Sequence, residues 1–439
     1  MMDIDSALKY LSVKLKEEFD DFVVSSSLGE KTQVKFANNN VVTTKFWESQ
    51  NIEIFASWKK RLVSTNVQDM RKEVIDKTIK QLYSFARKSD PNPEYYGIGK
   101  GPFRYSSFPL YDDRIANLEN PFTYVKDAIN SAQENGAERS AGVFEFSDGK
   151  YTLISSENVE ASSKDTAVYL SLRCHRGLGS GYSNQVGRSL NEIDASLAGR
   201  EAAITAVSSK DPQKIDAGNY DMIFSEYPFA NLASHFGSSA LISSVETQTS
   251  FITNMIGKEV SSSGIYIYDD PNIQNGLASR PFDDEGIPSK TTAIVEDGIL
   301  KTYLHNTSTS IRHNSANTAH AGLISPENTN LIISGKEVSE KKLFKDFSGL
   351  HITNLWYTRF QNYLNGEFSS IPRDGIFLYK NGEIVKPVTE IRISDNMLRV
   401  FRNIESMSNN KLQQCGWEVE DPVFCGKALV KNVKITRPN

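Results

Sequence analysis

Cysteine is scarce in this chain of 439 residues, which holds only Cys174, Cys415 and Cys425. No two of them form a CxxC pair, and an odd number of widely spaced cysteines excludes a framework of paired disulfides. Such usage is typical of a protein kept in a reducing compartment. We therefore expect a cytoplasmic protein.

Long apolar runs are also missing, because nowhere do eighteen apolar residues follow one another. A helix that spans a membrane needs about 20 such residues, so no membrane span is predicted. The chain opens Met-Met-Asp-Ile-Asp and reaches charged residues at once. This opening leaves no room for the apolar stretch of a signal peptide, and none is expected.

An excess of basic charge is the third absence, since 49 Lys and Arg stand against 54 Asp and Glu, a net charge of −5. Without a basic field, neither a nucleic acid nor an anionic membrane is an expected partner. At 39% hydrophobic and 10% aromatic residues, the chain can bury substantial cores, which excludes a disordered scaffold.

The first half of the chain alternates between helical and strand patterns. Leu8, Leu11 and Leu15 recur at helical spacing, and a second amphipathic stripe runs through residues 74–86. Residues 34–63 have the short β-rich runs of a hairpin meander. Two further strands are predicted on either side of a turn at Ser147-Asp148-Gly149-Lys150.

The second half is richer in strands. Turn residues at Glu296-Asp297-Gly298 and at Asn381-Gly382 lie between β-forming segments and predict two hairpins. We predict an α+β protein with an N-terminal α/β domain of hairpins and amphipathic helices at residues 1–212. A C-terminal β-rich domain is predicted at residues 213–439.

Polar clusters offer a few candidate sites from residue chemistry alone. Asp283, Asp284 and Glu285 could supply oxygen ligands to a hard cation, but a solvated turn is the favoured interpretation. His305, His313 and His320 are spaced eight and seven residues apart in a polar stretch that is predicted to be a flexible loop, and these gaps fit no standard pair of metal ligands. The glycines of residues 176–181 lack the pattern of a nucleotide site and predict a tight connection.

Residues 280–288, Arg-Pro-Phe-Asp-Asp-Glu-Gly-Ile-Pro, resemble the central signature of the TldD/PmbA family, which is known both as DNA gyrase modulators and as peptidases. Supporting matches lie at residues 254–260, 269–271, 379–388 and 425–427. The resemblance extends from about residue 193 to the C-terminus. It implies that Asp283, Asp284, Glu285 and Gly286 form a structural signature.

The active branch of the family carries a His-Glu-x-x-x-His zinc motif on a helix, with a further cysteine ligand near the C-terminus. By position, the corresponding helix here reads Ser234-His235-Phe236-Gly237-Ser238-Ser239, so hydroxyls replace both imidazoles. His235 and Cys425 alone supply two ligands, whereas a catalytic zinc requires three from the protein. We therefore expect no catalytic residues and no metal in this chain.

The resemblance thus implies a PmbA/TldE-like, non-catalytic subunit of a metallopeptidase complex that acts on unfolded or short peptides. Its implied partner is a TldD-like subunit that supplies the zinc, or a second copy in a homodimer. The binding of peptides along a strand edge is one implied contribution. Two alternatives remain open: a zinc peptidase with an atypical site that includes His235 and Cys425, and a protein-binding regulator of the gyrase-modulator type.

Overall fold

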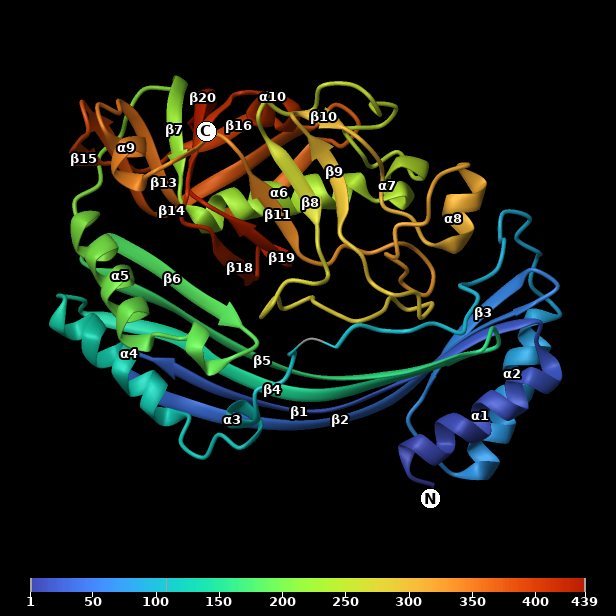
Figure 1. Ribbon diagram of the computed structural model, residues 1–439. Coiled ribbons are helices and arrows are strands. Elements are labelled where there is room, and N and C mark those ends of the chain that lie inside the picture. Colours follow the sequence, from blue (N-terminus) through green and yellow to red (C-terminus); the bar gives the residue numbers. More distant parts are fainter. Residues whose placement is uncertain (1, 108, 438–439) are drawn as a thin grey trace.

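A computed structural model describes residues 2–107 and 109–437 of the chain. A long curved sheet holds the C-terminal half of the chain against its concave face, and helices pack against its other face near both ends (Figure 1). The α+β class and the β-rich C-terminal half that the sequence predicted are confirmed.

Six antiparallel strands form the curved sheet in the order β3-β2-β1-β4-β5-β6. Asn38 and Asn39 adopt positive φ values of 50° and 62°, as the tight turn between the first two strands requires. The strands are β1 (Asp21–Ala37), β2 (Asn40–Trp58), β3 (Arg61–Val67), β4 (Arg139–Ser155), β5 (Val159–Arg176) and β6 (Gly179–Gly187).

The turn predicted at Ser147–Lys150 is wrong, because these residues lie in the middle of β4. Gly149 pairs with Gly29 of β1 on one side and with Asp165 of β5 on the other. Pairing on both sides satisfies the backbone of this segment, and it outweighs the local preference of Asp-Gly for a turn.

Helices pack beside the sheet in two pairs. In the first, Asp3 caps α1 and the buried residues Leu8, Leu11 and Leu15 form the predicted stripe. The helices of this half are α1 (Ile4–Glu18), α2 (Lys72–Ala86), α3 (Asp113–Ala116), α4 (Phe122–Glu134) and α5 (Ala195–Ser208), with a 3₁₀ turn at Leu190–Glu192. The pair α1/α2 covers one end of the sheet, and the pair α4/α5 packs with the other end.

Two further sheets build the C-terminal half. The smaller has the order β10-β9-β8-β11-β19-β18, and the larger runs β12-β17-β20-β16-β14-β13-β7, with β15 on its side. Because β20 also pairs with β7, five strands of the larger sheet close into a ring. The hairpins predicted around Gly298 and Gly382 are both present, as β9/β10 and β14/β15.

The larger sheet is built from β7 (Gly218–Phe224), β12 (Glu337–Val338), β13 (Gly349–Asn362), β14 (Glu367–Lys380), β15 (Glu383–Pro387), β16 (Arg392–Asn396), β17 (Ile404–Ser408) and β20 (Ala428–Thr436). The smaller contains β8 (Tyr266–Asp269), β9 (Thr292–Glu296), β10 (Ile299–Leu300), β11 (Leu331–Ser334), β18 (Leu412–Gly416) and β19 (Val419–Cys425). The helices are α6 (Glu226–Ala240), α7 (Ile242–Glu246), α8 (Thr307–Arg312), α9 (Glu340–Phe344) and α10 (Met397–Arg402). Helix α6 is buried almost throughout and contributes much of the largest hydrophobic core.

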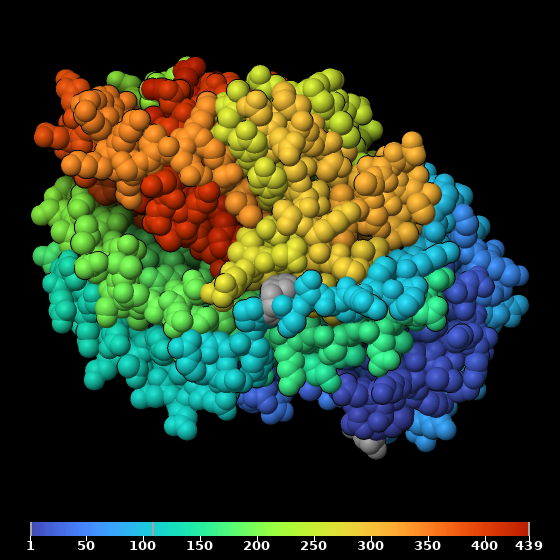
Figure 2. All heavy atoms as spheres, in the orientation of Figure 1, coloured from blue at the N-terminus to red at the C-terminus, as the bar shows by residue number. Residues whose placement is uncertain are grey.

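A loop rich in aromatic residues, residues 91–109, packs against both halves of the chain. Phe108 of this loop lies outside the described residues. In Figure 2 this segment crosses the junction beneath residues of the C-terminal half. Tyr95 and Ile98 are buried there, and the Tyr105 hydroxyl donates to the Gly286 carbonyl at 2.8 Å. Across the described ranges, no helix has both the length and the hydrophobicity that crossing a bilayer demands.

Candidate functional site

Helix α6 carries the positions that the resemblance aligned with the zinc motif. Its hydroxyls are turned back onto the helix: Ser239 Oγ donates to the His235 carbonyl at 3.0 Å, and Ser238 Oγ donates to the Ser234 carbonyl at 3.1 Å. Serines that bond in this way to the preceding turn offer little to a ligand outside the helix. Ser234 itself is 7% exposed.

His235 packs edge-on against Phe360, with 5.3 Å between the ring centroids. Burial, reinforced by the nearby charge of Arg359, lowers the pKa of this imidazole to about 4. The ring is therefore neutral at physiological pH and serves as an aromatic packing partner.

Cys425 lies at the opposite end of α6. Its Sγ donates to the carbonyl of Glu226 in the first turn, at 3.4 Å, and burial raises the pKa of the thiol well above its ordinary value. Ser234 follows Glu226 by two turns, about 12 Å along the helix axis. Among the described residues, the Cys425 thiol makes no hydrogen bond to Ser234 or His235, and its partner lies in the first turn of the helix.

The residues at these positions do not fit a zinc site. Within residues 2–107 and 109–437, no group of three or more His, Cys, Asp or Glu side chains has an arrangement that would hold a metal ion.

The three histidines of residues 305–320 also take separate roles. His320 and Asp269 are both fully buried and bond at 2.9 Å, while His313 bonds Glu246 at 2.6 Å. His305 is 2% exposed, and burial lowers its pKa to about 4. The prediction of a flexible loop here is wrong, because α8 and these buried contacts order the segment.

Asp283 is the centre of the signature loop. Its Oδ1 accepts from the backbone N–H groups of Glu285 at 3.0 Å and Ile287 at 2.9 Å, and its Oδ2 accepts from Ala321 at 3.0 Å. Gly286 completes the turn at a φ of 78°, where a Cβ atom would also lie 2.4 Å from the Val159 side chain. Asp283 therefore shapes the loop by satisfying its backbone.

Glu285 connects the signature loop to two distant segments. Its carboxylate accepts from the Gly99 N–H at 3.1 Å and from both the N–H, at 3.4 Å, and the hydroxyl of Thr307. Burial, and next the neighbouring Asp283, raise its pKa. The predicted solvated turn is wrong, because Asp283 is fully buried and Glu285 is 5% exposed once these segments close over them.

Asp284 has a different environment from its two neighbours, because successive side chains project in different directions. It lines a cavity of about 600 Å³ between the concave face of the sheet and the signature loop. There it contacts the Tyr151 hydroxyl at 3.3 Å and Arg280 at 3.6 Å. Burial raises its pKa, and the charge of Arg280 opposes that shift.

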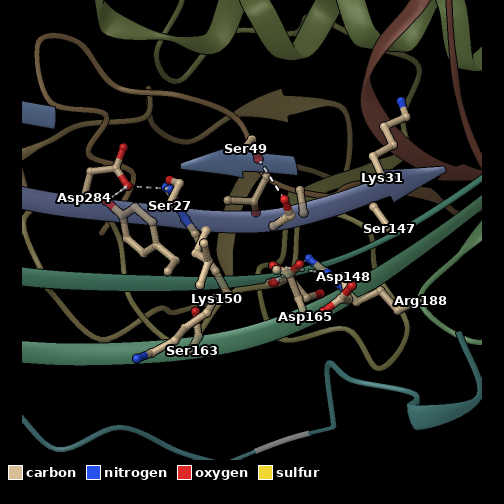
Figure 3. A pocket seen from close by; sticks show the side chains of 18 of the residues that line it. Ser27, Lys31, Ser49, Ser147, Asp148, Lys150, Ser163, Asp165, Arg188 and Asp284 are labelled. Carbon is tan, nitrogen blue, oxygen red and sulfur yellow. Dashed lines mark hydrogen bonds and ion pairs between the residues drawn. The ribbon is translucent and has the colours of Figure 1, made fainter. Parts of the chain in front are cut away.

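Small residues form the floor of this cavity (Figure 3). They occupy neighbouring positions of four strands, with Gly29 opposite both Ser49 and Gly149, and Tyr151 opposite both Ser27 and Ser163. The small floor residues are Ser27, Gly29, Ser49, Ser147, Gly149 and Ser163. Their short side chains leave the space that larger ones would fill.

Charged and amide side chains surround this floor. Arg188 reaches Asp165 at 3.5 Å and also donates to the carbonyls of Gly276 at 2.7 Å and Ser279 at 3.1 Å, so it ties the sheet to the roof. Two buried roof atoms, Arg280 Nε and Asn328 Oδ1, have no hydrogen-bond partner among the described residues. The cavity therefore combines charged side chains with free volume.

The sequence indicated some of this site and missed the rest. Arg280 and Asp284 belong to the signature that was recognised, whereas Arg188, Glu327 and Asn328 carried no motif. The alternation of small residues, as in Ser147-x-Gly149, is the signal that could have identified the floor, since alternate residues of a strand share one face.

The C-terminal half of the chain matches a known protein family. A family model described as the PmbA/TldA metallopeptidase C-terminal domain matches residues 217–437. Metalloprotease PmbA of Escherichia coli O157:H7 is 28% identical over 256 residues, which are 58% of this chain and 54% of that protein. The PmbA homologue of Haemophilus influenzae is 29% identical over 242 residues, 52% of this chain and 51% of that one. The chain thus spans about half the length of the curated relatives it matches.

Solved structures resemble the chain over nearly its whole length. TldE from Thermococcus kodakarensis aligns with a TM-score of 0.88 at 17% identity, covering 98% of this chain and 100% of that one. A proposed DNA gyrase modulator from Thermotoga maritima gives 0.86 at 21% identity, covering 99% and 100%. At these identities the likeness establishes the fold alone. Because the family model covers half of the sequence, we conclude that the chain belongs to the PmbA/TldD family, as the signature around Asp283 predicted.

Proposed function

We propose that this chain is a PmbA/TldE-like, non-catalytic subunit of a TldD/PmbA-type metallopeptidase complex in the cytoplasm. In this proposal a TldD-type partner supplies the zinc and the hydrolytic chemistry. The chain described here supplies a binding surface for unfolded or short peptides. One observation supports the proposal: Cys425 bonds to Glu226 in the first turn of α6, whereas Ser234 follows that residue by two turns, and clusters of three or more His, Cys, Asp or Glu side chains that could hold a metal ion are absent from the described residues.

The cavity between the two halves supports a role in peptide binding. Its volume, about 600 Å³, lies within the range of typical ligand sites. Its lining combines polar side chains such as Asp284 and Arg280 with a floor of small residues, which leaves room for a polypeptide backbone to approach the sheet.

The outer part of β2 supports a role as a subunit. Strand β3 pairs only with residues 52–58 of β2, so residues 40–51 pair with β1 alone among the described residues. Val42, Phe46 and Trp47 are 58%, 56% and 42% exposed along this open edge. A long edge with large apolar side chains promotes pairing with another chain, as a subunit contact would provide.

Metal analysis and peptide hydrolysis by the purified chain test this proposal, with and without a co-expressed TldD-type subunit. We expect no stoichiometric zinc and no hydrolysis by the chain alone, and both in the complex. Stoichiometric zinc with hydrolysis by the chain alone would instead support the atypical peptidase. In that case Cys425→Ser should abolish both, whereas the matched change at the other buried thiol, Cys174→Ser, should not.

The same purification tests the partner. A mass measurement in solution distinguishes a heteromeric complex, which we expect, from a homodimer of this chain. Phe46→Glu should weaken the complex, because it places a charge on the open edge of β2 without disturbing a buried contact. Glu48→Gln on the same strand is the matched control and should leave the complex intact.

A further inference from the structure

One face of the larger C-terminal sheet is rich in arginine. On β14, Ser369, Ile371 and Arg373 alternate along the strand and therefore share a face. On β13, Arg359 pairs with Ser369 and Trp356 pairs with Ile371, and cross-strand partners lie on the same side of a sheet. On β16, the Arg392 guanidinium reaches this side too, because its Nη1 donates to the Ser369 hydroxyl at 3.2 Å. We call this surface the arginine face; it consists of Trp356, Arg359, Ile371, Arg373 and Arg392.

Carboxylates do not balance these arginines. Arg373 is exposed and Arg392 is half-buried, and neither forms an ion pair with a carboxylate in the described part of the chain. The side chain of Arg359 is 62% exposed and comes no closer than 3.8 Å to the carboxylate of Glu418. Glu367, at the first position of β14, is the carboxylate that this strand itself adds to the face. The arginine face therefore presents accessible positive charge.

An aromatic ring supports the most exposed of these cations. The guanidinium of Arg373 lies over the ring of Trp356, 4.7 Å from its centroid, and Arg173 of β5 lies 4.8 Å from the same ring. Arg173 is already occupied, since it bonds both oxygens of Asp374, at 2.8 and 3.1 Å. A guanidinium that stacks through its flat side keeps the N–H groups of its edge for a second partner. Arg373 is thus held in place with its donors free.

A bulge in β13 extends this aromatic support toward Arg359. The register between β13 and β14 shifts between Trp356 and Arg359, and Tyr357 within the shift has a positive φ of 54°, which is uncommon for a bulky residue. Such bulges redirect side chains. Tyr357 is 47% exposed, stacks on Trp356 at 5.8 Å and carries the guanidinium of Arg359 at 5.5 Å from its ring centroid. Two arginines therefore lie on adjoining aromatic rings at an accessible surface.

The spacing of these arginines matches an extended chain. Arg373 and Ser369, the partner of Arg359, are four residues apart on β14, which is about 13 Å in a strand. In an extended peptide, alternate side chains share one face, and those four residues apart span the same distance. Carboxylates accept paired N–H groups from the edge of a guanidinium in short, charge-assisted hydrogen bonds.

We propose that the arginine face binds an extended acidic peptide segment whose carboxylates occupy alternate positions. Arg373 and Arg359 hold carboxylates at the two ends of the segment, and Arg392 holds one between them. The rings of Trp356 and Tyr357 support the guanidinium groups from below. This inference rests on the proposed function and deepens it, because it gives the bound peptide both a charge and a spacing.

Fluorescence anisotropy with four labelled, end-blocked heptapeptides tests the inference. Two contain three glutamates, either at every second position or in one contiguous run, and the other two carry glutamine or lysine at every second position. Serine and alanine fill the remaining positions. We expect the alternating glutamate peptide to bind about tenfold more tightly than the glutamine peptide, with the contiguous glutamate peptide between them and the lysine peptide weakest.

Variants of the full chain assign the effect to the arginine face. Arg373→Gln should weaken the alternating glutamate peptide about fivefold and leave the glutamine peptide unchanged. Because the Arg373 side chain is exposed and bonds to no described residue, this variant should fold as the parent does. Arg392→Gln repeats the test on the neighbouring strand. Arg87→Gln is the matched control, since it removes an exposed arginine that follows α2 in the N-terminal half, and it should keep the preference.

The outcomes separate this inference from the proposed function. If alternating and contiguous glutamates bind equally, or the preference for glutamate survives both arginine variants of the face, the inference is wrong while a peptide-binding subunit remains supported. Loss of the complex with a TldD-type subunit in Arg373→Gln would assign the face to a subunit contact, and tighter binding of a single-stranded oligonucleotide would assign it to nucleic acid. Either result would overturn the inference. If none of the peptides binds, either to the chain alone or to its complex, both the inference and the proposed function fail.

Discussion

On the concave face of the N-terminal sheet, the same strands pack against the C-terminal half in one region and border a cavity in another. In the sealed region, the cross-strand neighbours Leu153 and Ala161 pack beneath Phe282 of the signature loop. In the open region, four residues further along each strand, Gly149 and Asp165 face the cavity. The difference shows that side-chain size at a few alternate positions decides where the two halves seal and where they leave a binding space.

The sealed region should be the most sensitive to substitution. Phe282 is 3% exposed, and its ring lies 5.0 Å from that of Tyr105 and 6.2 Å from that of Tyr151. Phe282→Ala should lower the free energy of unfolding by about 3–5 kcal/mol, because it leaves a cavity between the halves. Urea denaturation measures this, with Phe85→Ala at a 63% exposed phenylalanine as the control. A loss no larger than that of the control would contradict the seal.

Loss of the hydrogen bonds of Asp283 should have the next largest effect on the free energy of unfolding. Both of its oxygens accept backbone N–H groups, so Asp283→Asn must place an amide NH₂ against at least one of these donors. Leaving a buried donor unsatisfied costs about 2 kcal/mol, which the same denaturation experiment can resolve. An unchanged midpoint would show that the loop holds its shape without this carboxylate.

Features that depend on local sequence could be predicted before the structure was known. The stripe of Leu8, Leu11 and Leu15 and the signature at Asp283 were identified correctly, because helical periodicity and a contiguous motif are local properties. The family and the α+β class followed from such signals and are confirmed.

What the sequence could not provide depends on contacts between distant residues. Glu285 was expected in solvent because its donors, Gly99 and Thr307, lie far away in the chain and meet it only after folding. Ser147–Lys150 was assigned to a turn because β1 and β5, which hold it in a strand, are not neighbours of it in sequence. The cavity was missed for the same reason, since it is the space left between two separately encoded halves.

The effect of pH on the free energy of unfolding, through the buried carboxyl of Glu285, should be smaller than the effect of Asp283→Asn. The folded-state pKa of Glu285 is raised above its ordinary value of 4.5 by burial, so the folded protein binds this proton more tightly than the unfolded chain. Stability from this group is therefore present at low pH and is lost as pH rises through the raised pKa. Glu285→Gln cannot ionise, so its stability relative to the parent should increase by about 1 kcal/mol between pH 5 and pH 7.

Denaturation series at each pH measure that difference. Glu160→Gln, which alters an exposed carboxylate on β5, is the matched control and should follow the parent at every pH. A difference between Glu285→Gln and the parent that shrinks as pH rises would mean that the buried carboxylate is stabilised in its charged form by Gly99 and Thr307.

The smallest effect on stability is expected at Asp284, although it stands between the two most constrained carboxylates of the motif. Its contacts, 3.3 Å to the Tyr151 hydroxyl and 3.6 Å to Arg280, are long, and the side chain faces the cavity. Asp284→Asn should therefore change the free energy of unfolding by no more than about 0.5 kcal/mol, as at surface positions. If Asp284→Asn destabilised the fold as strongly as Asp283→Asn, the motif would be structural throughout, and the open region would lose its distinct role.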